Sequence, residues 1–144
     1  MSISDVLRHK GHDVVRMRPT DTVAAAIGKF AERRIGAVVV EDAWMRVAGI
    51  FSERDVVEAI SRDGASVLDQ PLEALMSTPV ITCRATDRIE DVMAAMINAR
   101  VRHIPVVHDG KLTGIVSIGD LVKQRLDEKA LEANVLLDLS RMRA

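Results

Sequence analysis

One seven-residue pattern occurs twice in this chain and restricts the fold more than any other feature. Residues 49–55 read Gly-Ile-Phe-Ser-Glu-Arg-Asp, and residues 114–120 read Gly-Ile-Val-Ser-Ile-Gly-Asp. Two apolar residues follow each copy, which is typical of a buried strand that leads directly into a helix. Ser and Asp at a helix start favour an anion beside the free backbone N–H groups, but they can also be simple caps. Because the two copies stand in matching frames, we favour ligand sites.

The repeat extends well beyond this motif. Val14-Val15 corresponds to Val80-Ile81, and Phe30 corresponds to Met96, at an offset of 66 residues that falls to 65 after the second hairpin. An offset this constant predicts two halves with the same order of elements, β-α-β-β-α. Halves of about 60 residues are marginal alone, so we expect an α/β (α+β) fold in which they pack about a pseudo-twofold axis. The two Ser-x-x-Asp corners should then face one shared cleft.

Apolar spacing places the elements within each half. Val14-Val15 and Val80-Ile81 are predicted to be the first strand of each half, and Ser4 is predicted to cap a short helix before them. Apolar residues from Val23 to Phe30 recur at three- and four-residue spacing, as on one face of a helix. The β-branched run at residues 37–40 predicts a strand that is buried on both faces.

The same reading gives the domain boundaries. We expect a first repeat over residues 6–62, a linker over 63–74 and a second repeat over 75–125. From Asp120 onward the chain has neither Gly nor Pro, so residues 126–144 are predicted to form an amphipathic helix. That helix either folds back on its own domain or contacts a second subunit or a partner protein.

Composition excludes several classes of function. The net charge is −1, with 20 basic and 21 acidic residues, so no charge field attracts a nucleic acid or an anionic membrane. One Trp, two Phe and no Tyr leave few stacking platforms for a single strand. The single cysteine, Cys83, cannot form an internal disulfide, and the N-terminus lacks the charge and apolar regions of a signal peptide. We therefore expect a cytoplasmic protein without nucleic-acid or membrane partners.

Catalytic sequence patterns are missing. Neither Ser52 nor Ser117 lies in a Gly-x-Ser-x-Gly elbow, and there is no His-Glu-x-x-His motif or phosphate-binding loop. His9 and His12 are three residues apart, but Gly11 interrupts the helix that a metal-binding pair would need. The sequence therefore predicts no enzyme, no catalytic residue, no metal site and no catalytic cofactor.

Taken together, these motifs resemble a tandem pair of cystathionine-β-synthase (CBS) domains, also called a Bateman module. The resemblance rests on residues 49–57 and 114–122, on Leu-Met-Ser-Thr-Pro-Val at 75–80, and on Arg-His-Ile-Pro-Val-Val at 102–107. It covers roughly residues 6–125, and free-standing bacterial proteins of this size, with a helical tail, are similar along their whole length.

The resemblance implies a regulatory function. CBS pairs bind adenine nucleotides in clefts between the repeats, usually form a disc-shaped homodimer, and transmit signals by modulating an attached or separate partner protein. The ligands implied are AMP, ADP, ATP or NAD(H), with S-adenosylmethionine ranked behind them. For this chain, the partner would be regulated in trans. Its identity and the physiological nucleotide are outside what the motifs specify.

The resemblance also assigns site residues, because each family pocket joins the Ser and Asp of one repeat to the first two strands of the other. The first pocket would be formed by Ser52, Arg54, Asp55, Val80, Ile81, Val101, Arg102 and His103. The second would be formed by Ser117, Gly119, Asp120, Val14, Val15, Ile35, Gly36 and Ala37. Pro105, just beyond the first set, is a further ligand-binding candidate.

The two pockets differ in charge. A ribose offers two hydroxyl donors that an ionised Asp accepts, and a phosphate needs positive charge nearby. The first pocket has Arg102 and His103 where the second has the small, uncharged Gly36 and Ala37. We therefore expect the Asp55 pocket to bind AMP-like monophosphates most strongly. The second pocket is expected to be more open and to take a different ligand or the adenosine end of a dinucleotide.

Two other functions remain open at this stage. The chain could be a ligand-independent scaffold that docks a partner through residues 126–144, with clefts that no longer bind ligand. It could also be a small hydrolase that turns over a bound nucleotide. Partner capture that ignores nucleotide would favour the scaffold, and slow turnover of ATP or NAD would favour the hydrolase.

Overall fold

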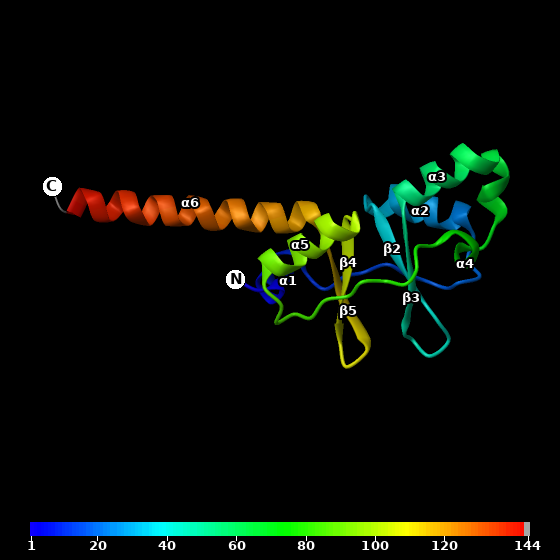
Figure 1. Ribbon diagram of the computed structural model, residues 1–144, viewed down its shortest axis with the longest axis horizontal. Helices are drawn as coiled ribbons and strands as arrows, with labels where there is room; N and C mark the ends of the chain where they lie inside the picture. Colours follow the sequence, from blue (N-terminus) through cyan, green and yellow to red (C-terminus); the bar gives the residue numbers. More distant parts are fainter. Residues whose placement is uncertain (143–144) are drawn as a thin grey trace.

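The computed structural model describes residues 1–142 and contains two α/β halves that lie side by side, with one long helix projecting from the second half (Figure 1). The predicted mixed α/β class and the C-terminal helix are confirmed. Along the chain, the elements are α1 (Ile3–Lys10), β1 (Arg16–Met17), α2 (Val23–Arg33), β2 (Ala37–Glu41), β3 (Val47–Ser52), α3 (Glu53–Asp63), the 3-10 helix η1 (Gly64–Asp69), α4 (Leu72–Leu75), α5 (Ile89–Ala99), β4 (His103–His108), β5 (Lys111–Ser117) and α6 (Ile118–Met142).

The central strand of the first half is buried on both faces, as its β-branched run predicts. β2 pairs in parallel with β1 and antiparallel with β3. Successive strand residues point to opposite faces, so Val38 and Val40 pack against α2 with Phe30 and Phe51. Val39 points the other way, toward the second half of the molecule.

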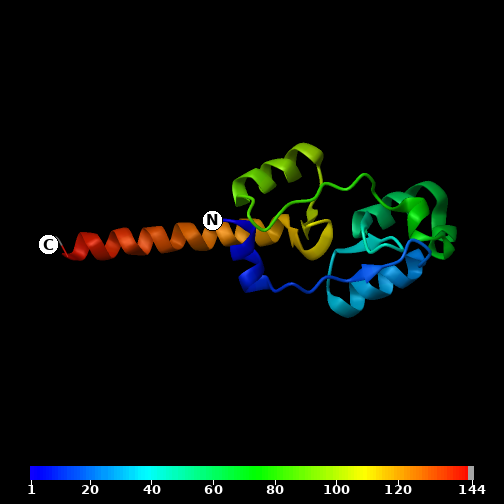
Figure 2. The same ribbon diagram turned by 90° about the horizontal axis from the view of Figure 1, so that it is seen from below.

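The second half has its own core and a two-stranded sheet, β4–β5. Ile104, Val106 and Val116 pack against α5, α1 and the start of α6, and α1 and α5 flank that first part of α6 (Figure 2). The two sheets meet through a cluster that we call the inter-sheet cluster. Its buried members are Ala37, Val39, Ile50, Leu112 and Ile115.

The first strands differ from their predicted positions. In the first half the strand is Arg16–Met17, two residues after Val14-Val15. In the second half Val80-Ile81 forms no strand, and only a single parallel bridge joins Cys83 to Val106. Pro105 provides the physical reason.

Pro105 occupies the position that Val39 has in the first half. The Val39 N–H donates to the carbonyl of Val15 at 3.0 Å, and this bond extends the pairing of the first strand with β2. A proline has no N–H, so the second half cannot form the equivalent bond, and its pairing shrinks to the bridge at Cys83.

The start of the first helix and the segment predicted as a linker also differ from the prediction. α1 begins at Ile3 with Ser2 as its N-cap, rather than with Ser4. The predicted linker over 63–74 contains η1 and most of α4, and Leu72 is fully buried in the core of the first half. The segment predicted as a linker therefore contributes to the core of the first half.

The predicted tail is part of a single helix, α6, of which residues 143–144 lie outside the described residues. Within residues 118–142 only Leu121 and Gln124 are buried, and the helix extends away from both halves (Figure 1). The alternative in which this helix folds back on its own domain is therefore wrong. None of the helices within residues 1–142 is long and apolar enough to cross a membrane.

Two glycines give opposite predictions for stability. A Cβ on Gly28, in the middle of α2, would meet no atom within 4 Å, and the corresponding position in α5 is already Ala94. Gly28→Ala should stabilise the fold by about 0.5–1 kcal/mol, because glycine loses more backbone entropy in a helix.

A Cβ on Gly49 would lie 2.7 Å from Cγ of Met76, so Gly49→Ala should destabilise by about 1–3 kcal/mol. Urea unfolding measures both, and a stabilised Gly49→Ala would contradict the packing of Met76 on β3.

Candidate functional site

The first Ser-x-x-Asp corner joins β3 to α3 and forms a capping box. The backbone N–H of Ser52 donates to Oδ2 of Asp55 at 2.9 Å, and the backbone N–H of Asp55 donates to Oγ of Ser52 at 3.3 Å. The other carboxylate oxygen, Oδ1, accepts a hydrogen bond from the Ser77 hydroxyl at 3.0 Å. Asp55 therefore acts as a helix cap through one oxygen and points the other toward residues from beyond its own helix.

A cavity of about 700 Å³ surrounds this corner, which is a suitable size for a small organic ligand. Both halves of the chain line it, so it is an inter-repeat cleft. Its walls include six of the residues assigned to the first pocket: Ser52, Arg54, Asp55, Val101, Arg102 and His103.

Other assigned residues lie elsewhere. Val80 packs beside the inter-sheet cluster, and the side chain of Ile81 is 41% exposed, so neither lines the cavity. Pro105 is buried inside β4. Gly36, which was assigned to the second pocket, lines the first.

The sequence analysis missed four polar residues of this cavity: Glu53, Glu58, Ser77 and Arg100. Ser77 is held there by an antiparallel bridge to Ile50, a pairing between segments that are distant in sequence. Arg100 caps the C-terminus of α5 in the left-handed conformation, with φ of 57°. The repeat gave one signal that could have drawn attention to Arg100. Its counterpart Arg34 has the same left-handed conformation at the end of α2.

Three arginine side chains, together with Glu53 and Glu58, line the walls of this cavity. The guanidinium-bearing side chains of Arg54, Arg100 and Arg102 line the main cavity, and the same three line an adjoining cavity of about 200 Å³. Arg54 also pairs with Glu58, its Nε lying 3.6 Å from the carboxylate. Such a wall suits a phosphate group, which accepts charge-assisted hydrogen bonds from several guanidinium groups.

His103 of the second half lies against Gly36 of the first. A Cβ on Gly36 would lie 3.3 Å from Nε2 of His103, so only a glycine leaves the imidazole this space. Burial lowers the pKa of His103, and the positive charge of Lys10 lowers it further, while Asp120 and Glu53 partly oppose this. The imidazole is therefore neutral at neutral pH and offers hydrogen bonds to a ligand rather than charge.

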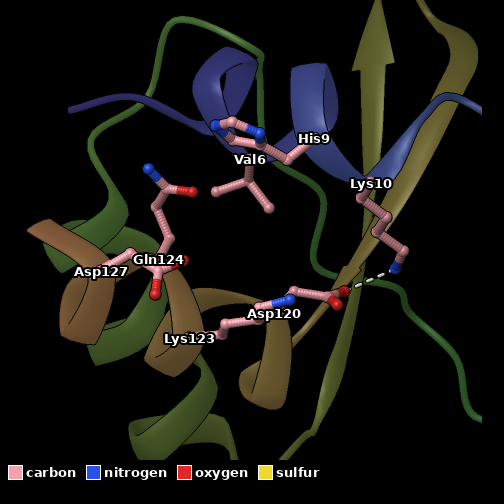
Figure 3. A pocket seen from close by; sticks show the side chains of 7 residues that line it. All are labelled: Val6, His9, Lys10, Asp120, Lys123, Gln124 and Asp127. Carbon is pink, nitrogen blue, oxygen red and sulfur yellow. Dashed lines mark hydrogen bonds and ion pairs between the residues drawn. The ribbon is translucent and has the colours of Figure 1, made fainter.

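The second corner has the same capping geometry but a different partner. The Ser117 N–H donates to Oδ2 of Asp120 at 2.8 Å, and the Asp120 N–H donates to Oγ of Ser117 at 3.1 Å. The same carboxylate also forms an ion pair with Lys10 from α1 (Figure 3). Burial alone would raise the pKa of Asp120, but the hydrogen bonds from Lys10 and Ser117 lower it overall.

The pocket expected at this corner is not formed as assigned. The cavity beside Asp120 is only about 220 Å³, and its other walls come from α1 and α6: Val6, His9, Lys10, Lys123, Gln124 and Asp127. This cavity contains Asp120 but no other residue assigned to the second pocket, so the expectation that this side is the more open one stays a prediction. The remaining residues assigned to it lie away from the cavity: Val14 and Ala37 at the inter-sheet cluster, Val15 and Ile35 against the first core, and Ser117 and Gly119 at the start of α6.

Comparisons with known proteins point to one family. The CBS domain family model matches residues 3–62 and 72–127. The crystal structure of the CBS-domain protein ATU1752 from Agrobacterium tumefaciens is 42% identical with a TM-score of 0.84, and covers 87% of this chain and 99% of that one. PAE2072 from Pyrobaculum aerophilum, a CBS domain protein complexed with AMP, is 27% identical with a TM-score of 0.74, and covers 83% and 89% of the two chains.

Curated sequences give the same family. An uncharacterized 17.7 kDa protein of Acidianus ambivalens is 37% identical over 118 residues, which is 81% of this chain and 70% of that protein. The uncharacterized protein MK0525 of Methanopyrus kandleri is 32% identical over 124 residues, which is 85% of this chain and 62% of that protein. Since these relatives are longer, their functions as whole proteins are not transferred to this chain.

The neutral state of His103 predicts a pH dependence of stability. Because the pKa is lowered from 6.5 in the folded chain, the unfolded chain binds more protons as the pH falls below 6.5. The free energy of unfolding should therefore fall with pH in this range, and His103→Gln should remove that part of the loss. Urea unfolding at several pH values measures the effect. His108→Gln is the control, because its side chain is 81% exposed, and equal pH slopes for wild type and His103→Gln would contradict the assignment.

Proposed function

Because this chain belongs to the CBS-domain family, we propose that it is a regulatory module that binds an adenine nucleotide in the cavity beside Asp55. The observation that carries the proposal is the lining of that cavity, in which the Asp55 carboxylate at a helix start and three arginines, beside Glu53 and Glu58, share one space of about 700 Å³. The AMP complex of PAE2072 supports the same ligand class.

A nucleoside monophosphate matches the groups of this cavity. The ribose hydroxyls donate to Oδ1 of Asp55, which now accepts only from Ser77. The phosphate lies against Arg102 and Arg100, and the adenine ring lies in the apolar part of the lining formed by Ile50, Val57 and Val101. AMP is the first candidate, and ADP, ATP and NAD(H) extend from the same position toward the adjoining cavity.

Regulation follows from the position of the cavity between the halves. A ligand that contacts both halves stabilises the arrangement in which those contacts fit, and it shifts the population toward that arrangement. The change passes to a partner protein in trans, in a signalling rather than a catalytic function. A homodimer is part of the proposal, and exposed apolar side chains offer a surface for it on α3, α5 and α6: Val57, Ile60, Ile97 and Val122.

Substitution at the two corners tests the proposal. Asp55→Ala should weaken AMP binding by about 10- to 150-fold, because hydrogen bonds to a charged group contribute about 1.5–3 kcal/mol. Asp120→Ala should have a much smaller effect, since its carboxylate already pairs with Lys10. Isothermal titration calorimetry measures both affinities, and equal losses would contradict the assignment to Asp55.

The matched control is Asp5→Ala. Asp5 forms the same capping box with Ser2 in α1, its Oδ2 accepting from the Ser2 N–H at 2.9 Å, but it does not line the cavity. It should leave AMP binding unchanged. Thermal unfolding with AMP, ADP, ATP, NAD, NADH and S-adenosylmethionine then ranks the ligands, because a ligand at 100 times its Kd adds about 2.7 kcal/mol of stability. No stabilisation by any of them would reject the nucleotide proposal.

Exposed apolar residues on α6 favour a second candidate function, ligand-independent docking of a partner protein. Leu126, Leu131, Leu136 and Met142 are 61–83% exposed on a helix that extends away from the domains. Most helical stability in proteins comes from packing of an apolar face, so a partner that covers these side chains would stabilise the helix.

This second candidate has its own test. The double variant Leu131→Gln/Leu136→Gln should lose the partner, because it removes apolar area from the exposed face of α6, while Lys129→Gln on the same stretch should retain it. Affinity capture with and without AMP, followed by mass spectrometry, measures the effect. A partner that is lost by the double variant and is indifferent to AMP supports docking through α6. A partner whose capture depends on AMP and not on α6 favours the regulatory module alone.

A further inference from the structure

The second Ser-x-x-Asp corner is occupied by a side chain of the protein itself. Lys10, the last residue of α1, extends its ammonium group to Oδ2 of Asp120 (Figure 3). The same ammonium group donates a second hydrogen bond to the carbonyl oxygen of Ile115 at 2.8 Å. The pair is partly shielded from water, with the two side chains 31% and 27% exposed.

The helix that carries Lys10 is firmly anchored. Ile3, Val6 and Leu7 of α1 are 0–3% exposed in the second core. Leu7 packs directly on β5, where a Cβ on Gly114 would lie 3.0 Å from its Cδ2. Gly11 then ends α1 with φ of 94°, a conformation that favours glycine. The packing of α1 therefore fixes the position of Lys10 beside Asp120.

The first corner shows what Lys10 replaces. There, Ser77 donates its backbone N–H to the carbonyl of Ile50 at 2.9 Å and its hydroxyl to Asp55. Ile115 and Asp120 are the repeat counterparts of Ile50 and Asp55. One ammonium group thus takes the place of both donors of Ser77.

The replacement changes charge and space. The Ser77 hydroxyl is neutral, so Asp55 keeps its negative charge beside a cavity of about 700 Å³. Lys10 brings a full positive charge to Asp120, and the cavity of about 220 Å³ beside this pair is lined by α1 and α6 of the second half alone, so it is not an inter-repeat cleft. A ribose would have to compete with an ion pair for the carboxylate.

We infer that Lys10 closes the second corner of the repeat and limits the chain to one nucleotide, bound beside Asp55. The inference rests on the proposed function of the Asp55 cavity. Lys10 is a specificity-determining residue, because its ion pair, and not the Ser-x-x-Asp motif, decides whether that corner accepts a ligand. Removal of the ammonium group exposes the Asp120 carboxylate and creates a second site.

Binding stoichiometry tests this inference. Equilibrium dialysis of the full chain against labelled AMP should give one AMP per chain for wild type. Lys10→Met keeps most of the aliphatic side chain but removes the charge, and it should bind two AMP per chain at saturation. Lys10→Met/Asp120→Ala should return to one. Lys123→Met is the matched control, because Lys123 lines the same cavity without an ion pair to Asp120, and it should stay at one.

The outcomes separate this inference from the proposed function. Two AMP per wild-type chain, or one per folded Lys10→Met chain, would overturn the inference and leave the Asp55 site standing. Absence of binding to both wild type and Lys10→Met would overturn both. Lys10→Gln repeats the test if Lys10→Met does not fold. A double-mutant cycle of Lys10→Met and Asp120→Asn, measured by thermal unfolding without ligand, must show that the two residues are coupled. Losses of stability that simply add in the double variant would also overturn the inference.

Discussion

The packing of one sheet against the other is the interaction on which the rest of this structure depends. Ala37, Val39 and Ile50 of the first half meet Leu112 and Ile115 of the second, all at most 9% exposed. Halves of this size bury too little apolar surface alone, so the shared cluster stabilises both. It also brings the start of α3 opposite β4, and a cavity lined by both halves exists only because these sheets stay together.

Each motif aspartate can cap a helix and bind a ligand, and these two functions compete only in part. A carboxylate has two oxygens, and in both corners Oδ2 accepts from the backbone N–H of the serine and so stabilises a helix start. The choice between a cap and a ligand site is therefore not exclusive. What distinguishes Asp55 from Asp120 is the group that meets the carboxylate from outside the motif, a neutral hydroxyl in one case and an ammonium in the other.

This difference bears on how a duplicated chain becomes asymmetric. The backbone hydrogen bonds of the two halves are equivalent at these corners. The N–H of Glu53, the first residue of α3, donates to the carbonyl of Gly36, and the N–H of Ile118, the first residue of α6, donates to the carbonyl of Arg102. Side chains on this conserved frame then diverge. One corner acquires an arginine wall and a cavity, while the other acquires an ion pair and a long helix with exposed leucines. The structure thus combines a cavity lined by both halves with a long helix that projects from the second half.

The sequence alone determined the features that local pattern encodes. The constant offset predicted two similar halves, the run Ala37–Val40 predicted a doubly buried strand, and the Ser-x-x-Asp motifs predicted both helix starts. The resemblance also assigned Arg102 and His103 to the side of Asp55, and both line its cavity. These predictions succeeded because periodicity, capping and repeat register are set by residues close together in the chain.

Only the tertiary structure decided the features that depend on contacts between distant segments. The loss of the strand at Val80-Ile81 follows from Pro105, which lacks the N–H that its partner strand would need. Ser77 reaches Asp55 across 22 residues, and Lys10 reaches Asp120 across 110. No local pattern records such a meeting, because the energy of an ion pair or hydrogen bond depends on where packing places the two groups. The sequence therefore specified two Ser-x-x-Asp corners, and the fold decided which group from a distant segment meets each carboxylate.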